Sequence, residues 1–475
     1  MNRRIIVVGG GISGLAAAHQ LIELSRERSL ALDVHLLEAS DRLGGCIKTE
    51  RVGGFLIEAG PDSFISEKPW ALRLCERLGI SSRLISTNPA NQNIYVVHQG
   101  SLQPLPEGFL LLAPTRLWPF IQTPIFSWRG KFRIVCELFL PREGIDDDES
   151  LASFVRRRFG AELLERVAQP LIGGIYGADP EQLSLSATMP RFLEMERSRR
   201  SVIWAMWREQ RRRSQNQKTG SGARWSLFVT LAGGMQELVD SIANHLPKGA
   251  VHPNTRVAEL HWNGTKRNWT VATDKGEKFE ADGVILALPA YGSAELLASL
   301  VPELATELRA IPYSSAATVN LAYRLADIPH ALNGFGFVVP AIESRKIIAC
   351  TFSSTKYSGR APAGYVLLRA FVGGALQPSL FAQDDHTMER SVRKELADFL
   401  GVRAEPLFCR IHRHSRSMPQ YHVGHRERIR RIEAHLSPLR TLALAGSAYH
   451  GVGIADCIHS GEVAAERVLQ QLQES

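Results

Sequence analysis

The sequence holds little cysteine: six residues among 475, none of them in a C-x-x-C pair. This spacing fits neither a zinc site nor a disulfide framework, so we predict no metal site and a reducing, cytoplasmic compartment. No run of about 18 apolar residues occurs, so no membrane-spanning helix is predicted. The few apolar residues before the first glycine run are too short for a signal peptide. Hydrophobic (44%) and charged (22%) fractions are those of a globular protein, which excludes disordered and fibrous classes.

Charge of one sign is concentrated in a single short segment. Lysine and arginine exceed aspartate and glutamate by eight (56 − 48), and residues 197–213 hold seven arginines against Glu209 alone, a local sum of +6. Because the excess is local, it predicts a basic surface patch and argues against a nucleic-acid-binding protein. Trp204 and Trp207 lie among these arginines, a composition that suits an anionic membrane surface. A solvated helix face is the alternative interpretation.

Glycine placement gives the first functional motif. The apolar run at residues 5–8 predicts a buried strand, and Gly9, Gly11 and Gly14 follow it in the G-x-G-x-x-G pattern. A helical stretch comes next, and then a second apolar strand that closes on Glu38. The three glycines permit a tight turn, admit a pyrophosphate to the backbone and let the helix pack on the strand. The N-terminus of the helix can then bind a phosphate, and Glu38 can accept hydrogen bonds from ribose hydroxyls. The motif therefore predicts a Rossmann-type dinucleotide site.

A second glycine-rich loop distinguishes an FAD-binding site from an NAD-binding site. Residues 38–45 read EASDRLGG, which places Arg42 beside Gly44 and Gly45. Such a loop allows close approach and carries a fixed positive charge, so it suits another phosphate contact. Here the sequence resembles the flavin-containing amine oxidase superfamily, which implies non-covalently bound FAD in a glutathione-reductase-like domain.

The resemblance also implies where the chain meets FAD. Glu38 is expected to contact the adenosine ribose, and the backbone of Val257 is expected to contact the adenine. Residues 451–454 are expected to cover the flavin ring, and a final helix is expected at 460–472. A hairpin turning at residues 53–54 delivers the next segment towards the flavin. The residues assigned to the cofactor are Gly9, Gly11, Ile12, Ser13, Gly14, Glu38, Ala39, Arg42, Gly44, Gly45, Gly60, Pro61, Asp62, Ser63, Val257, Gly446, Gly451, Val452, Gly453 and Ile454.

Seven short motifs, in order along nearly the whole chain, narrow the resemblance. They are Gly60-Pro61-Asp62-Ser63-Phe64, Gly174-Ile175-Tyr176-Gly177-Ala178-Asp179-Pro180 with Leu183-Ser184, Thr230-Leu231-Ala232-Gly233-Gly234-Met235, Phe352-Ser353-Ser354, Phe371-Val372-Gly373-Gly374, Pro419-Gln420-Tyr421 with Gly424-His425, and Gly451-Val452-Gly453-Ile454 with Asp456-Cys457-Ile458. With these motifs the chain resembles the oxygen-dependent porphyrinogen oxidases, which act on coproporphyrinogen III or protoporphyrinogen IX. Between these two substrates the motifs favour coproporphyrinogen III slightly.

The resemblance implies a six-electron oxidation of a porphyrinogen to a porphyrin in haem biosynthesis. Hydride passes to flavin N5 and O2 re-oxidises the flavin to give H2O2, so no side chain is assigned a catalytic role. The protein needs to position the substrate and exclude water. The pocket residues implied are Phe371 stacking on a pyrrole, Val338 and Thr351 beside it, and the Gly174 carbonyl accepting from pyrrole N–H groups. The substrate propionates need a cation, and the candidates are Arg369, Lys346 and Arg413.

The predicted fold is α/β, with an α+β substrate domain and a helical, membrane-contacting domain inserted into the FAD-binding domain. The predicted boundaries are 1–90, 226–290 and 438–475 for the FAD-binding domain, 91–101 and 291–437 for the substrate domain, 102–213 for the helical domain and 214–225 for a linker. A peripheral position on the cytoplasmic membrane face, a homodimer and hand-over of product to the next haem-pathway enzyme are left open.

Two other functions compete with this interpretation. One is a different activity of the same superfamily, amine oxidation or polyene desaturation, although neither a flavin-facing lysine nor an aromatic amine cage is placed by a motif. The other is a non-enzymatic carrier that has lost FAD. The intact glycines and the acid Glu38 argue against such a carrier.

Overall fold

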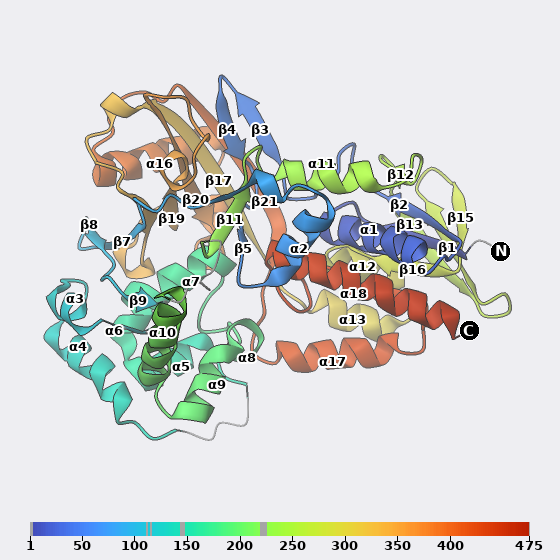
Figure 1. Cartoon of the computed structure of the whole chain (residues 1–475), viewed down its shortest axis with the longest axis horizontal. Coiled ribbons are helices and arrows are strands. Elements are labelled where there is room, and N and C mark those ends of the chain that lie inside the picture. Colours follow the sequence, from blue (N-terminus) through green and yellow to red (C-terminus); the bar gives the residue numbers. More distant parts are fainter. Residues whose placement is uncertain (1–2, 111–112, 115, 143–147, 219–225, 475) are drawn as a thin grey trace.

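The computed structural model describes residues 3–110, 113–114, 116–142, 148–218 and 226–474. Figure 1 shows three regions: a sheet flanked by helices near both chain termini, a larger sheet, and a group of helices below the larger sheet. We call them the Rossmann region, the substrate sheet and the helical region.

The Rossmann region is built on a five-stranded parallel sheet of order β12-β2-β1-β16-β22. The strands are β1 (Arg3–Val8), β2 (Leu32–Leu37), β12 (Val251–His252), β16 (Gly283–Leu286) and β22 (Leu442–Leu444). In β1, Ile5 and Val7 enter one apolar core, whereas Ile6 and Val8 enter another on the opposite face. Because both faces are buried, the strand reads as a continuous apolar run.

Helices cover both faces of this sheet. The helices of the first core are α1 (Ile12–Glu27), α2 (Pro69–Arg77), α11 (Gln236–His245) and α18 (Ile454–Gln473), and those of the second are α12 (Ala290–Leu297), α13 (Pro302–Arg309) and α17 (His425–Leu436). The expected start of the last helix at residue 460 is wrong. Extended Gly453 serves as the N-cap, and buried Ile454 and Ile458 continue the packed face back to that glycine.

Three small antiparallel units are connected to the Rossmann region. They are the sheet of β13 (Val257–Asn263), β14 (Asn268–Thr273) and β15 (Lys278–Ala281), the sheet of β5 (Phe64–Ile65), β6 (Leu84–Ser86) and β11 (Phe228–Leu231), and the hairpin of β3 (Thr49–Val52) and β4 (Phe55–Glu58). The first packs in the second core of the Rossmann region through Leu260 and Trp269. The hairpin turns at Gly53 and Gly54, as expected, and both have positive φ, 55° and 85°.

The substrate sheet has seven strands in the order β21-β17-β20-β19-β18-β7-β8. They are β7 (Asn93–His98), β8 (Ser101–Pro104), β17 (Tyr313–Arg324), β18 (Gly334–Val338), β19 (Ala349–Phe352), β20 (Tyr365–Gly373) and β21 (Phe408–Pro419), with the helices α14 (Ser353–Lys356), α15 (Pro378–Phe381) and α16 (Asp385–Leu400). On one face, Met388, Val392 and Leu396 of α16 pack against the sheet. On the other, Val96 joins the core of the helical region. The two faces therefore meet different partners.

The helical region begins with short strands. Its elements are β9 (Phe109–Leu110), β10 (Ala113–Pro114), α3 (Leu117–Gln122), α4 (Trp128–Val135), α5 (Leu151–Phe159), α6 (Ala161–Leu163), α7 (Gln169–Tyr176), α8 (Leu185–Thr188), α9 (Pro190–Arg199) and α10 (Val202–Lys218). Helix α10 runs into the predicted linker, because glutamine and lysine at 215, 217 and 218 are good helix formers; residues 219–225 lie outside the described residues. Within the described ranges, no helix is long and apolar enough to cross a membrane.

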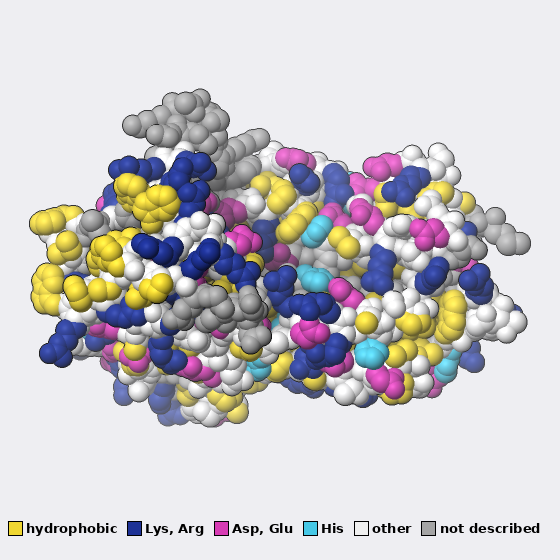
Figure 2. Space-filling model, turned by 90° about the horizontal axis from the view of Figure 1, so that it is seen from below, with side chains coloured by type: hydrophobic (Ala, Val, Ile, Leu, Met, Phe, Trp, Pro, Cys, Tyr) yellow, Lys and Arg dark blue, Asp and Glu magenta, His cyan; other side chains and the backbone are white. Residues whose placement is uncertain are grey.

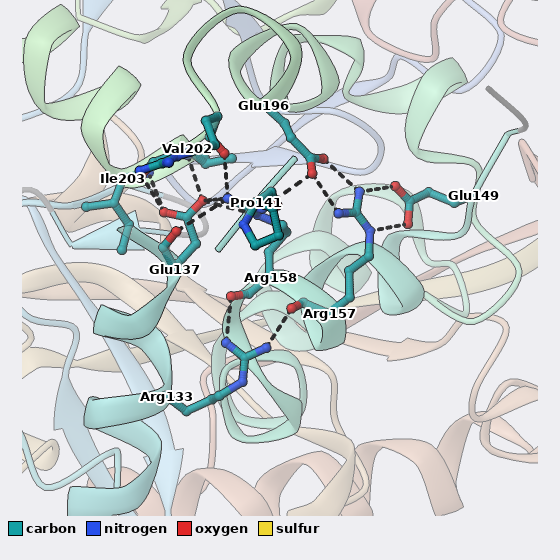
Figure 3. Close-up of polar contacts among 11 residues, drawn as sticks. Arg133, Glu137, Pro141, Glu149, Arg157, Arg158, Glu196, Val202 and Ile203 are labelled. Atoms are coloured by element: carbon teal, nitrogen blue, oxygen red, sulfur yellow. Dashed lines mark hydrogen bonds and ion pairs between the residues drawn. The ribbon is translucent and has the colours of Figure 1, made fainter. Parts of the chain in front are cut away.

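The helical region has a charged core that sequence analysis did not foresee (Figure 3). Arg158, 1% exposed, donates to the carboxylate of Glu137, which is fully buried. The same carboxylate accepts from the hydroxyl of Ser201 at 2.6 Å and from the N–H of Val202 at 2.8 Å, so it caps the start of α10. Beside it, Arg157 donates to Glu149 and Glu196, at 2.6 and 2.7 Å. We call these two arginines and three glutamates the ion cluster.

Candidate cofactor and substrate site

The glycine turn after β1 leaves an open cradle at the start of α1. Gly9 has a φ of 106°, and a Cβ on Gly14 would lie 1.9 Å from the carbonyl oxygen of Gly9, so only glycine fits at either position. A Cβ on Gly11 would meet nothing within 4 Å, and Gly11, the N-cap of α1, leaves the helix without a side-chain cap. The side chains of Ile12 and Ser13 are buried, so the first turn offers its backbone N–H groups. A pyrophosphate fits this cradle.

Glu38 lies beside the cradle at the end of β2. Its carboxylate accepts from the N–H of Gly10 at 2.6 Å and from the N–H of Ser40 at 2.8 Å, which fixes the acid next to the turn. The carbonyl of Glu38 accepts from the N–H of Thr255 at 2.8 Å. That contact brings the start of β13, with half-buried Val257, to the same edge of the sheet. The structure therefore gathers the residues expected around ribose and adenine.

The second glycine loop lies against the first. Gly44 has a φ of 106° and pairs with Gly11, and exposed Ala39 precedes the loop. Arg42 donates to the carbonyl oxygens of Ile47, at 3.0 Å, and Gly45. Its guanidinium thus holds the loop in shape, and its contact with a phosphate stays a prediction.

The chain bends at Gly60 and approaches this loop; we call residues 60–63 the 60–63 turn. A Cβ on Gly60 would lie 1.8 Å from the carbonyl oxygen of Cys46, so no larger residue fits. The carboxylate of Asp62 accepts from Ser63 at 2.7 Å and lies 3.3 Å from the ammonium of Lys356 and 3.9 Å from the guanidinium of Arg369. Burial would raise the pKa of Asp62, but these two cations hold it far below its usual value.

The predicted pocket residues share one face of the substrate sheet. Phe371 of β20 lies opposite Ala349 of β19, which lies opposite Val338 of β18. One pleat away, Arg369 lies opposite Thr351. Since directly opposed residues, and residues two apart, point to the same side, these side chains project together, away from α16.

This face meets the 60–63 turn through direct contacts. Arg369 donates to the carbonyl oxygen of Gly60, and the hydroxyl of Thr318 donates to the carbonyl oxygen of Ala59 at 2.9 Å. A ring nitrogen of His414 lies 2.8 Å from that same oxygen, and burial lowers the pKa of this histidine. Phe371 is therefore held beside the turn that the family resemblance assigns to the flavin.

The cation for the propionates stays a prediction. Arg369 is 4% exposed, and its guanidinium lies 4.8 Å from the ring centroid of Phe371. Arg413 projects to the opposite face of the sheet and pairs with Asp385 at 2.6 Å, so the fold does not bring it to the pocket. Lys346 is exposed before β19.

The end of α7 closes the pocket from the helical region. Gly174, exposed in its last turn, has no heavy atom within 4 Å of an added Cβ, and the carbonyl of Gly177 accepts from Ala375 at 2.8 Å. A small cavity of about 30 Å³ lies between α7 and the substrate sheet. Its walls include Gln169, Gly173, Gly177, Val339, Ile347 and Gly374. Acceptance of pyrrole N–H groups by the Gly174 carbonyl stays a prediction.

The C-terminal glycine segment completes the cofactor side. Gly446 follows β22 and donates to the hydroxyl of Ser460 at 3.0 Å. Gly451 leaves room for the carboxylate of Asp456, because a Cβ there would lie 2.4 Å from that carboxyl carbon, and Asp456 pairs with Lys68 at 2.6 Å. This pair fixes the loop that precedes α18.

The same loop joins the regions. Val452 packs against the helical core, while Ile454 packs in the Rossmann core. The hydroxyl of Tyr421 donates to the carbonyl of Ser447 at 2.6 Å, and its ring stacks on His425, with centroids 4.0 Å apart. Both side chains therefore support the junction of the regions.

Sequence analysis missed Lys356 and Asn320. Lys356 lies two residues after the Phe352-Ser353-Ser354 motif, but a single lysine carries no spacing signal. Asn320 lies opposite Arg369 on the pocket face; it is fully buried, and both polar atoms of its amide lack a partner among the described residues. Its polar side chain at an inward position of β17 was the available signal.

Comparison with known proteins agrees with this site. The family described as "Flavin containing amine oxidoreductase" matches residues 12–469. The chain therefore belongs to this family of oxidoreductases, and FAD is its cofactor; the cradle, Glu38 and the glycine loops fit that group. The predicted superfamily and the α/β fold class are confirmed.

The relatives narrow the class further. Coproporphyrinogen III oxidase of Bacillus subtilis (strain 168) is 36% identical over 472 residues, 99% of each chain. Protoporphyrinogen oxidase of Homo sapiens is 31% identical over 490 residues, again 99% of each. A crystal structure described as a "Putative protoporphyrinogen oxidase" from Exiguobacterium sp. 255-15 superposes on this chain with a TM-score of 0.85 and 31% sequence identity. The match covers 100% of this chain and 99% of that one. The resemblance to porphyrinogen oxidases is confirmed.

Proposed function

We propose that the protein oxidises a porphyrinogen to the porphyrin in haem biosynthesis, with coproporphyrinogen III preferred to protoporphyrinogen IX. One observation carries the proposal: the pocket face with Phe371, Thr351 and Val338 meets the 60–63 turn next to the cofactor cradle. Three relatives that are 33% to 36% identical to this chain are coproporphyrinogen III oxidases, which supports the preferred substrate.

The chain's own residues bind and orient the substrate. Non-covalently bound FAD would accept the hydride and pass the electrons to O2, with H2O2 as product. Phe371 presents a flat ring for a pyrrole, and Val338 adds an apolar wall that excludes water. The Gly174 carbonyl accepts from pyrrole N–H groups, and Arg369 provides positive charge on the propionate side. Aromatisation drives the reaction, so positioning is the protein's main contribution.

The experiment is a paired fluorescence assay in air. The flavin-loaded protein receives coproporphyrinogen III or protoporphyrinogen IX, and porphyrin emission and H2O2 are followed together. We expect both products with both substrates, and faster oxidation of coproporphyrinogen III. A flavin-free Gly11→Val variant is the control for oxidation by air alone. If the loaded protein oxidises neither substrate, an amine oxidase or polyene desaturase activity replaces the proposal.

We further propose that the protein is a peripheral membrane protein, and that one end of the helical region contacts the cytoplasmic face of the membrane. Figure 2 shows hydrophobic side chains gathered at this end beside lysine and arginine. Trp118, Trp128, Phe132 and Phe139 are 68% to 76% exposed, far more than soluble surfaces usually leave aromatic rings. Arg211 lies 3.6 Å from the ring centroid of Trp207, so cation and indole are adjacent.

Vesicle binding tests this contact. We expect binding to vesicles of anionic phospholipid that weakens with salt, and loss of binding in a Trp128→Ala, Phe132→Ala double variant. Leu407→Ala, which removes a 49% exposed side chain elsewhere, is the matched control and binds as the wild type does. No binding to either neutral or anionic vesicles would instead favour the solvated helix face.

The same exposed rings also suit contact with another protein chain. A homodimer and hand-over of the porphyrin to the next haem-pathway enzyme therefore belong to the proposal. Light scattering of the purified protein measures the first. Retention of the porphyrin on the protein until the next enzyme is added measures the second.

A further inference from the structure

A second cavity lies on the opposite side of the substrate sheet from the candidate active site. It measures about 400 Å³ and lies where α16 and the segment after it meet the end of β17. Its walls are Tyr323, Arg390, Arg393, Lys394, Ala397, Val402, Arg403 and Ala404. Ligand sites for small molecules have volumes of this size. Four of the eight wall residues are cations, and none is acidic.

Helical spacing explains how the cations come together. Arg390, Arg393, Lys394 and Ala397 lie three and four residues apart, on one side of α16. The apolar residues of α16 pack on the sheet from another side. Like charges at this spacing repel each other, so the arrangement costs stability unless an anion offsets it.

The neighbouring acids neutralise this charge only in part. Arg393 pairs with Glu405 and also interacts electrostatically with Glu389. Among the described residues, neither Lys394 nor Arg403 has an ion-pair partner. At least two positive charges therefore remain available to a ligand.

Tyr323 adds a polar group to the floor of the cavity. Its side chain is 1% exposed, yet its hydroxyl makes no hydrogen bond to any other described residue. Burial raises the pKa of Tyr323, so the hydroxyl keeps its proton at neutral pH and can donate. This donor lines the same cavity as the four cations, so it is available to a ligand there.

The cavity is separate from the proposed active site. Val319, Leu321 and Tyr323 alternate with Thr318 and Asn320 along β17, and only the second set faces the 60–63 turn. A ligand of the cavity therefore touches neither Phe371 nor the cofactor cradle.

We propose that this cavity binds a small polyanion with two or more phosphate or carboxylate groups. The guanidinium groups of Arg390, Arg393 and Arg403 suit such groups, because each offers paired donors to two oxygens. The Lys394 ammonium adds charge from the helix, and the Tyr323 hydroxyl donates from the floor.

Isothermal titration calorimetry on the flavin-loaded protein tests the proposal, with inorganic tripolyphosphate and citrate as probes. We expect saturable binding of at least one probe, and about 10-fold weaker binding in Lys394→Gln and Arg403→Gln, since a charged hydrogen bond contributes roughly that much. Tyr323→Phe weakens binding about 3-fold or more. Tighter binding of tripolyphosphate indicates a phosphorylated ligand, and tighter binding of citrate indicates a polycarboxylate.

Arg324→Gln is the matched control, because Arg324 is exposed next to Tyr323 but is not a wall residue. It removes the same charge and leaves the affinity within about 2-fold. Flavin content, equal in all variants, shows that the fold is intact. No saturable heat with either probe overturns the proposal, as does an equal loss of affinity in Arg324→Gln. Porphyrinogen oxidation is not the readout, so the test is independent of the proposed function.

Discussion

The Rossmann region and the helical region differ in whether their polar groups have hydrogen-bond partners within the protein. At the start of α1, three glycines remove side chains and leave backbone N–H groups beside open space. In the helical region, the ion cluster joins buried Arg158, half-buried Arg157 and three buried glutamates, which bond to one another and to backbone groups (Figure 3). A cofactor site keeps donors free for a ligand, whereas a structural cluster satisfies its donors internally.

This difference separates binding from stability. Changes in the glycine cradle should remove the cofactor and leave the fold intact. Changes in the ion cluster should weaken the fold and leave the cofactor site intact. Each experiment below measures flavin content and stability together, from the largest expected effect to the smallest.

The strongest test of the comparison is Gly11→Val. An added Cβ at this position meets nothing within 4 Å in the protein, so the variant should fold. The side chain would occupy the space that a pyrophosphate needs, so we expect complete loss of bound flavin and of its visible absorbance. Circular dichroism and the absorbance spectrum of the purified variant provide the measurement.

Gly14→Ala is the contrasting variant for this position. Its Cβ would lie 1.9 Å from the carbonyl oxygen of Gly9, so the turn itself must move and stability should fall too. If Gly11→Val retained a full complement of flavin, the phosphate assignment of the cradle would be wrong.

The second test is Glu137→Ala in the ion cluster. It leaves the Arg158 guanidinium buried without its carboxylate and removes the cap of α10. Breaking a buried pair in this way costs about 3–5 kcal/mol of unfolding free energy, measured by urea denaturation. Flavin content of the folded fraction should stay at the wild-type level.

Glu181→Ala is the control, since its pair with Arg156 is exposed and contributes about 1 kcal/mol or less. Equal losses in the two variants would show that burial does not distinguish the cluster from the surface.

The same contrast explains what could be predicted from the sequence. The strand, glycine turn, helix and acid lie within 38 residues, so their spacing reveals the cradle without knowledge of the fold. The ion cluster joins residues 137–196 across several elements, and no local pattern marks a glutamate as buried. The Asp62–Lys356 contact spans 294 residues, so only the folded chain identifies it. The pocket face was predicted in part because Phe371 belongs to a motif, whereas Asn320 does not.

The third test concerns Asp62, where the Rossmann region meets the substrate sheet. Its folded-state pKa is lowered by Lys356 and Arg369, so its stabilising effect is present above the unfolded pKa of about 3.9 and is lost as the pH falls through the folded value. We expect the wild type to lose about 1.4 kcal/mol below pH 4 for each unit of lowering. Asp62→Asn lacks this acid-side slope and is less stable at pH 7; urea midpoints across pH 2–7 measure both. A parallel slope in the variant would assign the acid sensitivity to other carboxyls.

The smallest expected effect is that of Phe371→Ala on the pocket face. A stacked aromatic contact contributes about 0.5–1.5 kcal/mol beyond its buried area, so KM for the porphyrinogen should rise about 3- to 10-fold, with flavin content unchanged. The adjacent Val372→Ala removes a side chain from the α16 face of the same strand and should lower stability without changing KM. This pair extends the separation of binding from stability to the two faces of one strand. If Phe371→Ala lowered flavin content and left KM unchanged, Phe371 would belong to the cofactor side, and the pocket would have to be sought nearer to α7.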